Sequence, residues 1–317
     1  MPVYRKVLLK NKNKYSTRLR IDMWNQRYLY LMMLPGIIYF LIYKYWPMAG
    51  LSIAFREFSF TRGMFGGDFV GLKYFEYIFF QHRDFWKLIR NTFLINVYRI
   101  FFFFPVPIIL ALMINEIIGI SYKRIMQTIV YLPHFVSWVV FGSIFIKLLA
   151  PEGGVVNELL KLFGSKPTFF LSEPKYFRSI VVITDILKQA GWGTIVYLAA
   201  ITNIDPCLYE SAKMDGASKF MTILHITIPS ITDIIVVLLL LNIGRIMEVG
   251  FEQIYVMYNP LVYDTGDVIS TYVYRVGIGN ARFSLTTAIG MFQSVIGFVL
   301  LMSCNAISKK LFSRGLW

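Results

Sequence analysis

Six apolar stretches, each long enough to cross a lipid bilayer, constrain the fold of this chain more than any other feature. A transmembrane helix needs ~20 largely apolar residues. The stretches lie at about 28–51, 90–115, 125–149, 179–201, 231–250 and 284–307. Backbone groups cannot stay unpaired in lipid, and the sequence lacks the alternating segments of a membrane β-barrel. The predicted fold is therefore an all-α membrane protein with six transmembrane helices.

The basic residues predict the orientation of these helices. With both termini in the cytoplasm, the inner segments hold 15 Lys/Arg and 4 Asp/Glu, whereas the outer segments hold 11 and 10. Cytoplasmic loops of membrane proteins carry an excess of Lys and Arg. The formal net charge of +14 is therefore interpreted as a signal of membrane topology. It also predicts that the chain binds anionic lipid and not nucleic acid. The expected parts are a basic cytoplasmic tail at 1–27, a transmembrane domain at 28–307 and a cytoplasmic tail at 308–317.

A polar loop at 205–229 separates two of the apolar stretches and is predicted to be structured. Asp205 is a good N-cap and Pro206 suits the first position of a helix, so a short helix is expected from Pro206 to Met214. Asp215-Gly216 interrupts it, because Gly tolerates the backbone angles of a sharp turn. A second short helix is expected from Ala217 to about Thr227.

This loop resembles the EAA loop of ABC-transporter permeases, whose pattern is Glu-Ala-Ala, three residues, Gly, nine residues and Ile-x-Leu-Pro. The matching residues are Glu210, Ser211, Ala212, Gly216, Ile226, Ile228 and Pro229. Ser replaces the first Ala and Ile replaces Leu. The resemblance extends over roughly 25–317 and is closest to oligosaccharide-type permeases of binding-protein-dependent importers, which have a MetI-like fold. The segment 250–275 and Gly315-Leu316-Trp317 are similar to the subgroup that works on complex saccharides.

The resemblance implies a set of partners in the bacterial cytoplasmic (inner) membrane. They are a second permease, expected to be a distinct sister chain, two ATPase subunits, an extracytoplasmic solute-binding protein and an oligosaccharide substrate. In this family the short loop helix inserts into the ATPase subunit, and ATP and Mg are bound by the ATPase subunits, so no cofactor is expected on this chain. The implied ATPase-coupling residues are Glu210, Ser211, Ala212, Asp215, Gly216, Ala217 and Pro229.

The sequence contains no motif for catalysis. A Gly-Lys-Ser/Thr phosphate loop is absent, and the three histidines are scattered over different segments without zinc-ligand spacing. The chain is therefore predicted not to be an enzyme by itself.

Polar residues inside the apolar stretches point to a substrate pathway, since ionisable groups at membrane depth are costly. Asn242, Arg245 and Glu248 follow one another at intervals of three, which places them on one stripe of the expected 231–250 helix. Gln253 continues the stripe outward. The preceding stretch holds Lys188, Gln189 and Trp192. Amide, guanidinium, carboxylate and indole groups suit a sugar.

Other interpretations remain at this stage. Arg245 and Glu248 are equally consistent with an ion pair that stabilises the helix bundle or the contact with a sister chain. The chain as a whole is also consistent with an ion-coupled carrier, which would use Glu248 or Asp185, or with a membrane scaffold that conducts nothing.

Overall fold

The computed structural model describes residues 24–312, which divide into two units between residues 69 and 70. In the first unit, α2 (Arg27–Phe40), a π-helical stretch (Leu41–Tyr45) and a 3-10 stretch (Trp46–Phe55) follow one another as a single helix of 29 residues. The apolar window of this helix has no buried residue. Isolated bridges at Arg56–Phe69 and Ser59–Gly63 close the loop that follows.

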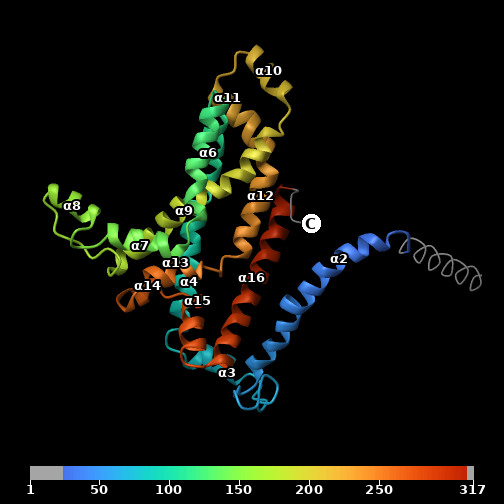
Figure 1. The fold of residues 1–317 in the computed structure, drawn as a ribbon, viewed down its shortest axis with the longest axis vertical. Coiled ribbons are helices and arrows are strands. Elements are labelled where there is room, and N and C mark those ends of the chain that lie inside the picture. The colour runs from blue at the N-terminus through green and yellow to red at the C-terminus, as the bar shows by residue number, and fades with distance from the viewer. Residues whose placement is uncertain (1–23, 313–317) are drawn as a thin grey trace, which may run out of the picture. The chain divides into compact units, whose positions relative to one another are not determined.

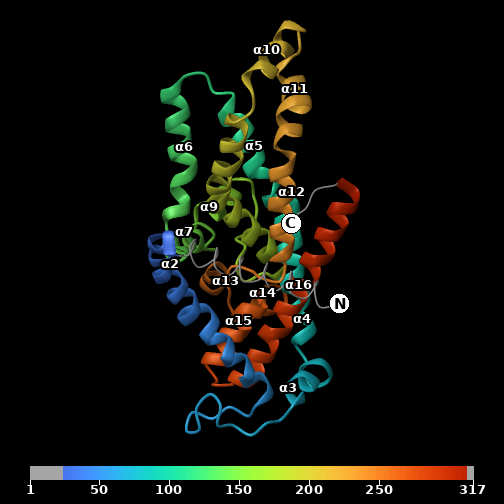
Figure 2. The same ribbon diagram turned by 90° about the vertical axis from the view of Figure 1, so that its right-hand side faces the viewer.

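The second unit consists of helices joined by turns, and the residues described contain no named strand (Figures 1 and 2). The all-α prediction is therefore confirmed for this part of the chain. The elements are α3 (Lys73–Glu76), η3 (Tyr77–Gln81), α4 (Phe85–Tyr98), η4 (Arg99–Phe103), α5 (Pro105–Asn115), α6 (Ile120–Phe135), α7 (Trp138–Leu148), α8 (Val155–Leu162), α9 (Pro174–Thr202), α10 (Pro206–Met214), α11 (Lys219–Thr222), η5 (Ile223–Thr227), α12 (Ile228–Gly244), α13 (Phe251–Met257), η6 (Pro260–Val262), α14 (Tyr263–Gly266), α15 (Ile269–Tyr272), η7 (Val273–Ile278) and α16 (Phe283–Phe312).

Four helices in the described residues are long and apolar enough to cross a membrane, at Arg27–Phe55, Phe85–Asn115, Lys219–Gly244 and Phe283–Lys310. They correspond to four of the six predicted stretches. The stretch at 179–201 lies within α9, a helix of 29 residues that is long enough but carries buried polar side chains, including Asp185 and Lys188. The length of α9 therefore matches the prediction, whereas its polarity sets it apart from the other four.

The predicted stretch at 125–149 is broken rather than straight. Helices α6 and α7 meet at an angle of 96°, and the pair is a fifth candidate span or a re-entrant loop. The break has a local cause. Pro133 near the end of α6 removes a backbone donor, and the Ser137 hydroxyl accepts a hydrogen bond from the amide of Val140 at 3.3 Å, which caps a new helix.

The helix predicted at 231–250 is also shorter than expected, because α12 ends at Gly244. Residues 245–248 form turns instead, in which the amide of Glu248 donates to the carbonyl of Arg245 at 2.8 Å. The prediction that Asn242, Arg245 and Glu248 lie on one helical stripe is therefore wrong. Intervals of three match a helix face only while the helix continues.

Helix α9 is the centre of the second unit, since it packs against α5, α6, α12 and α14. Two apolar clusters form along it. One, towards α10, joins α9 to α5 and α12 through residues such as Ile114, Leu198 and Ile231. The other, towards α14, includes Phe177, Val181 and Ile254.

The contact between α6 and α9 is unusually close at Gly191, where a Cβ atom would lie 1.9 Å from the carbonyl oxygen of Val130. A side chain at this position would push the two helices apart. Gly191 therefore fixes how near α6 can approach the central helix.

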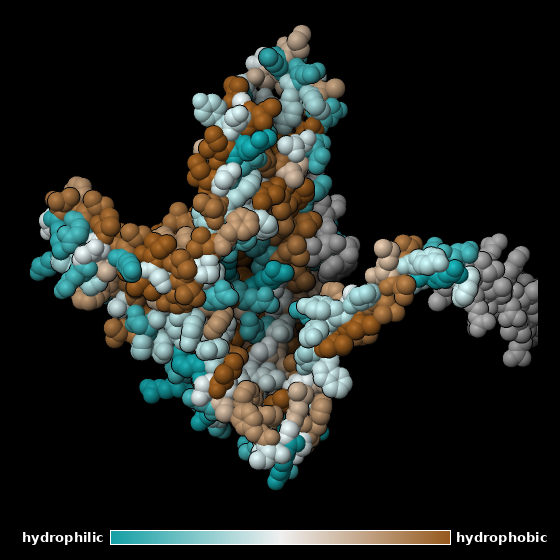
Figure 3. All heavy atoms as spheres, viewed as in Figure 1, coloured by the Kyte–Doolittle hydropathy of each residue, from teal (hydrophilic) through white to brown (hydrophobic). Residues whose placement is uncertain are grey.

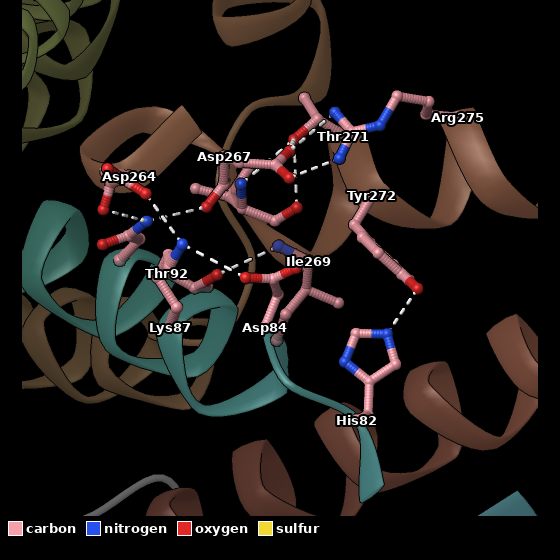
Figure 4. A network of polar contacts seen from close by, with 12 residues as sticks. His82, Asp84, Lys87, Thr92, Asp264, Asp267, Ile269, Thr271, Tyr272 and Arg275 are labelled. Carbon is pink, nitrogen blue, oxygen red and sulfur yellow. Dashed lines mark hydrogen bonds and ion pairs between the residues drawn. The ribbon is translucent and has the colours of Figure 1, made fainter. Parts of the chain in front are cut away.

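A polar network fastens the segment 260–275 to the start of α4 (Figure 4). Lys87 pairs with Asp264 at 2.7 Å, and the Thr92 hydroxyl accepts from the amide of Ile269 at 3.1 Å. His82 and Tyr272 share a hydrogen bond of 2.6 Å. Burial lowers the pKa of His82, so the imidazole is kept neutral in this contact.

Asn91 is the fully buried member of this junction. Its amide nitrogen donates to the carbonyls of Asp264 and Asp267, at 3.1 Å each, and its amide oxygen accepts from Arg178 at 2.8 Å. One side chain thus connects α4, α9, α14 and the residue that follows α14. Such a bridge is costly to remove, because each buried polar group left unpaired costs ~1–3 kcal/mol.

We expect Asn91→Leu to lower the free energy of unfolding by about 3 kcal/mol, because it removes the hydrogen-bond partner of three polar groups while keeping the number of side-chain heavy atoms. Thermal unfolding of the purified protein in detergent, followed by the fluorescence of tryptophans such as the buried Trp138, measures this. The control is Asn280→Leu, at an exposed turn position, which should leave the midpoint nearly unchanged. Equal midpoints for the two variants would contradict the role assigned to Asn91.

Candidate functional site

The predicted loop helix is present with the expected bounds, as α10 (Pro206–Met214). The Asp205 carboxylate accepts from the amide of Cys207 at 2.9 Å, as an N-cap does. Gly216 follows with φ +73°, a left-handed conformation that favours glycine. The second helix begins at Lys219, two residues later than predicted, because the Ser218 hydroxyl accepts from the amide of Met221 and so acts as the cap.

The second helix of the loop does not stop before Pro229. Helix α11 continues through the π-helical stretch η5 into α12, and the three together form one helix from Lys219 to Gly244. A π-helical stretch widens the turn ahead of the proline, which has no amide to donate. The turn at Asp215-Gly216 forms an elbow between α10 and this helix. The elbow is therefore attached directly to a helix that is long enough to cross a membrane.

The loop lies at one end of the second unit and is accessible to a partner. All seven predicted coupling residues are exposed except Ala212, which is half-buried. Met214 and Phe220, with 88% and 71% of their surfaces exposed, flank the elbow. Figure 3 shows mainly hydrophilic side chains around α10 and apolar ones along α6 and α7. The tip therefore combines a polar surface with a few apolar anchors.

Two contacts hold the loop in place. The hydroxyls of Tyr209 and Thr227 lie 3.1 Å apart and join its two arms. Lys219 pairs with Glu116, at the end of α5, at 3.4 Å. The two arms of the loop are thus joined to each other and to the end of α5.

A cavity of about 320 Å³ lies at the other end of the 219–244 helix. Three of the predicted pathway residues, Asn242, Arg245 and Glu248, line it. Arg245 and Glu248 are exposed, and within the described chain they form no ion pair with each other, so the pairing interpretation has no support in this structure. The remaining lining residues are Asn96, Arg99, Ile100, Phe103, Val249 and Gly250.

Arg99 gives this cavity a charged group that sequence reasoning did not assign to it. Its Nε donates to the Asp185 carboxylate at 2.7 Å, and Asp185 is only 2% exposed. Arg99 occupies the middle of the 85–115 helix, so the pair lies far from both ends of that helix. Because the ion pair uses one edge of the guanidinium, the opposite edge stays available to the cavity.

The other four predicted pathway residues make contacts within the protein. Lys188 is buried and donates to the carbonyl of His134 at 2.8 Å. Gln189 bonds to the His134 ring at 2.6 Å, and Trp192 stacks on that ring at 4.5 Å between centroids. Gln253 is buried and donates to Val181 and to the hydroxyl of Thr184. The structure therefore groups Lys188, Gln189 and Trp192 around α6, away from the lining of the cavity.

The residues missed by sequence reasoning are Asn96 and Arg99. A charged residue two positions before a run of four phenylalanines is a signal that can be read from the sequence, and it could have marked Arg99. Asn96 is far from α12 in the sequence, so no local pattern could have predicted that the two lie together in the fold. Among the described residues, no group of three or more His, Cys, Asp or Glu side chains is arranged to hold a metal ion.

Known proteins similar to this chain include a transport system permease. The chain is 43% identical, over 96% of its length and 95% of the relative's, to the polygalacturonan/rhamnogalacturonan transport system permease protein YteP of Bacillus subtilis (strain 168). It is also 43% identical to protein LplB of the same organism, over 96% and 94% of the two chains. These matches span nearly the whole of each protein.

A solved structure and a family model agree with the relatives. A chain of the bacterial alginate ABC transporter, crystallised in complex with alginate pentasaccharide-bound periplasmic protein, superposes with a TM-score of 0.85 at 43% identity and covers 94% of this chain and 100% of that chain. This match confirms the predicted permease fold. Residues 104–316 match the model of the binding-protein-dependent transport system inner membrane component. The chain therefore belongs to this family of inner-membrane transport components.

Proposed function

We propose that this chain is the permease subunit of an ATP-driven importer that moves oligosaccharides delivered by an extracytoplasmic binding protein. The observation that carries the proposal is one continuous helix, Lys219–Gly244, which connects an exposed elbow at one end with a charged cavity at the other. An importer needs this combination of a contact for an energy source and a polar site at membrane depth. Relatives named for polygalacturonan and alginate transport support a saccharide as the substrate.

The proposal includes six spans with both termini in the cytoplasm. Helix α9 is then the fourth span, which tolerates Asp185 and Lys188 because they face neighbouring helices and not lipid. The bent pair α6–α7 is the third span. The basic tail at 1–27, the transmembrane domain at 28–307 and the tail at 308–317 follow from the same topology. The N-terminal and C-terminal tails lie largely outside the described residues.

Energy must come from partner subunits, because the sequence has no phosphate-binding loop. Two ATPase subunits would contact α10 and Gly216, and ATP and Mg would be bound there. A second permease, a sister chain, would complete the pathway, since six helices are few to enclose a channel. ATP must bind the outward-open assembly better than the inward-open one, or the equilibrium between them does not move.

Affinity purification of the chain from its native membrane, followed by mass spectrometry, tests the assembly. We expect an ATPase subunit and a second permease to be retained. The complex is then reconstituted in vesicles with its binding protein, and ATP hydrolysis is measured with oligogalacturonates and with alginate oligosaccharides. Loss of both partners under conditions that preserve a control transporter, or hydrolysis that no saccharide stimulates, would contradict the proposal.

The elbow generates a prediction about coupling. Gly216→Pro forces φ to about −65° where the loop needs a positive angle, and it removes the amide that donates to Lys213 at 3.1 Å. We expect the variant complex to insert and to bind ATP, but to lose the saccharide-stimulated part of its ATP hydrolysis and its uptake. Glu210→Lys, which reverses a charge on the exposed face of α10, should weaken both in the same direction.

A matched control is available on another loop. Gly164 also has a positive φ, +78°, and its amide also donates to a carbonyl three residues earlier, that of Lys161. Gly164→Pro causes the same local strain at the end of α8, far along the chain from the elbow. Normal uptake by the Gly216→Pro complex, or an equal loss in both variants, would remove the coupling role of the elbow.

The cavity generates a prediction about the substrate. Arg245→Ala removes a charged donor that has no ion-pair partner among the described residues, so its hydrogen bonds are free for a ligand. A hydrogen bond to a charged group contributes ~1.5–3 kcal/mol, which corresponds to about a tenfold to hundredfold change in kcat/KM for uptake. We expect a loss in that range, measured with labelled oligogalacturonate in vesicles.

Arg83→Ala is the comparison, because Arg83 is exposed and lies outside the cavity. Its uptake should match that of the unmodified complex. If Arg245→Ala transports as well as Arg83→Ala does, then Arg245 makes no contact that matters for transport.

A further inference from the structure

A groove of about 570 Å³ lies between α9 and the helix formed by α4 and η4. Tyr98 and Phe102 line it on the α4–η4 side, and Thr265 of α14 also contributes. It shares no lining residue with the charged cavity. Its volume is within the usual range of ligand pockets, ~300–1,000 Å³. The groove is therefore a second hollow, separate from the site assigned to the substrate.

The polarity of the groove changes along α9. Its first lining residues after Pro174 are Lys175, Arg178 and Ser179, and the ones that follow, Val182, Ile183 and Ile186, are all apolar. The eleven-residue interval from Lys175 to Ile186 extends about 16 Å along a helix. This is about half of the ~30 Å hydrocarbon core of a bilayer. The groove thus passes from a basic end to an apolar end over the depth of one leaflet.

The basic end lies at the boundary of the apolar stretches on both helices. Lys175 and Arg178 come just before the stretch at 179–201, and Arg90 begins the stretch at 90–115. Arg90 donates to the carbonyl of Asp264 at 3.4 Å, and Arg178 donates to the carbonyl of Thr265 at 3.1 Å. Two consecutive carbonyls therefore hold the two guanidinium groups near each other, at the level where lipid head groups begin.

These cations keep hydrogen-bonding capacity for a ligand. Lys175 is exposed and forms no ion pair within the part of the chain that the structure describes. Arg178 bonds to Thr265, to the Asn91 amide oxygen at 2.8 Å and to Tyr98, but a guanidinium has five N–H groups, so some remain available. The Asp264 carboxylate pairs with Lys87 at 2.7 Å and forms no ion pair with Arg178. An anion at this end would add a partner that the protein itself does not supply.

A ligand that fills this groove must be charged at one end and apolar at the other. Phe102 and Ile183 keep 63% and 52% of their surfaces exposed, so the apolar part is open to an acyl chain from the bilayer. A soluble anion would leave that part empty. A saccharide would place hydroxyls against Val182 and Ile186, where they would find no partners. A zwitterionic head group would bring a positive charge to a basic rim.

We propose that this groove binds an anionic phospholipid of the outer leaflet, with its phosphate at Lys175 and Arg178 and an acyl chain along Phe102, Ile183 and Ile186. The assignment to the outer leaflet rests on the proposed function, because that topology places the elbow in the cytoplasm and the start of α9 at the outer surface. The lipid would contact Arg178, which bonds to Asn91, and so would support the junction between α4, α9 and α14.

The test measures lipid binding to the chain purified with its retained partners. Native mass spectrometry counts bound phosphatidylglycerol across a lipid titration, and phosphatidylcholine with the same acyl chains is the zwitterionic comparison. Lys175→Gln removes one charge and should weaken phosphatidylglycerol binding about fivefold, with little effect on phosphatidylcholine. The matched control is Lys166→Gln, which removes an exposed charge outside the groove and should leave both unchanged.

A second variant tests the apolar part of the groove. Ser179 is exposed, lines the groove and makes no side-chain hydrogen bond within the described chain. Ser179→Trp keeps every charge but places a large ring between the basic end and the apolar end, so it should weaken phosphatidylglycerol binding by a similar factor. Weakening by Lys175→Gln but not by Ser179→Trp would indicate attraction to surface charge alone and would overturn the groove as the site.

Other occupants give other outcomes. Equal phosphatidylglycerol binding by Lys175→Gln and Lys166→Gln overturns the proposal. Competition by glycerol 3-phosphate would indicate a site for soluble anions, competition by hexagalacturonate would indicate an acidic saccharide, and loss of the second permease from both groove variants would indicate a subunit contact. Each of these results overturns the lipid site. Lipid counting needs no transport, so a complex that binds phosphatidylglycerol through Lys175 but imports no saccharide would keep the groove and overturn the importer.

Discussion

The ion pair between Arg99 and Asp185 sets the arrangement of the helices around the cavity. Asp185 is almost completely buried, and an unpaired charge in the interior of a membrane protein is costly, so Arg99 must stay within reach of α9. The same helix face carries Lys188, which bonds to α6, and Thr184, which bonds to Gln253 on α13. Because all these contacts converge on α9, this helix holds the elements of the cavity at fixed distances.

The elements that the sequence predicted well are those with local causes. Asp205 and Pro206 start α10, and Gly216 ends the turn after it, each through the chemistry of its own side chain or backbone. The grouping of pathway residues was less predictable, because it depends on which helices continue. Spacing alone placed Glu248 on the stripe of Asn242, but α12 ends before it, and the cavity takes its other wall from Asn96 and Arg99.

Polarity explains why α9 departs from the pattern of the other long helices. A helix surrounded by protein needs no apolar face towards lipid, so it can carry the charged and hydroxyl side chains that position its neighbours. Sequence reasoning treated Lys188 and Gln189 as pathway residues because they were polar at membrane depth. Their bonds to His134 place them between α6 and α9 instead, which is the other common reason for a polar residue inside a membrane protein.

The long helix from Lys219 to Gly244 gives the molecule a mechanical connection between its two ends. At 1.5 Å per residue, its 26 residues extend about 39 Å, comparable to the thickness of a bilayer. A helix transmits displacement as a stiff rod, whereas a chain of turns would absorb it. In the proposed importer, movement of α10 about Gly216 would therefore reach Asn242 and the turn that holds Arg245, while the ion pair with Asp185 would keep Arg99 on α9. In that proposal the two walls of the cavity would shift relative to each other, and the charged groups proposed to hold a saccharide in one position would separate in the other.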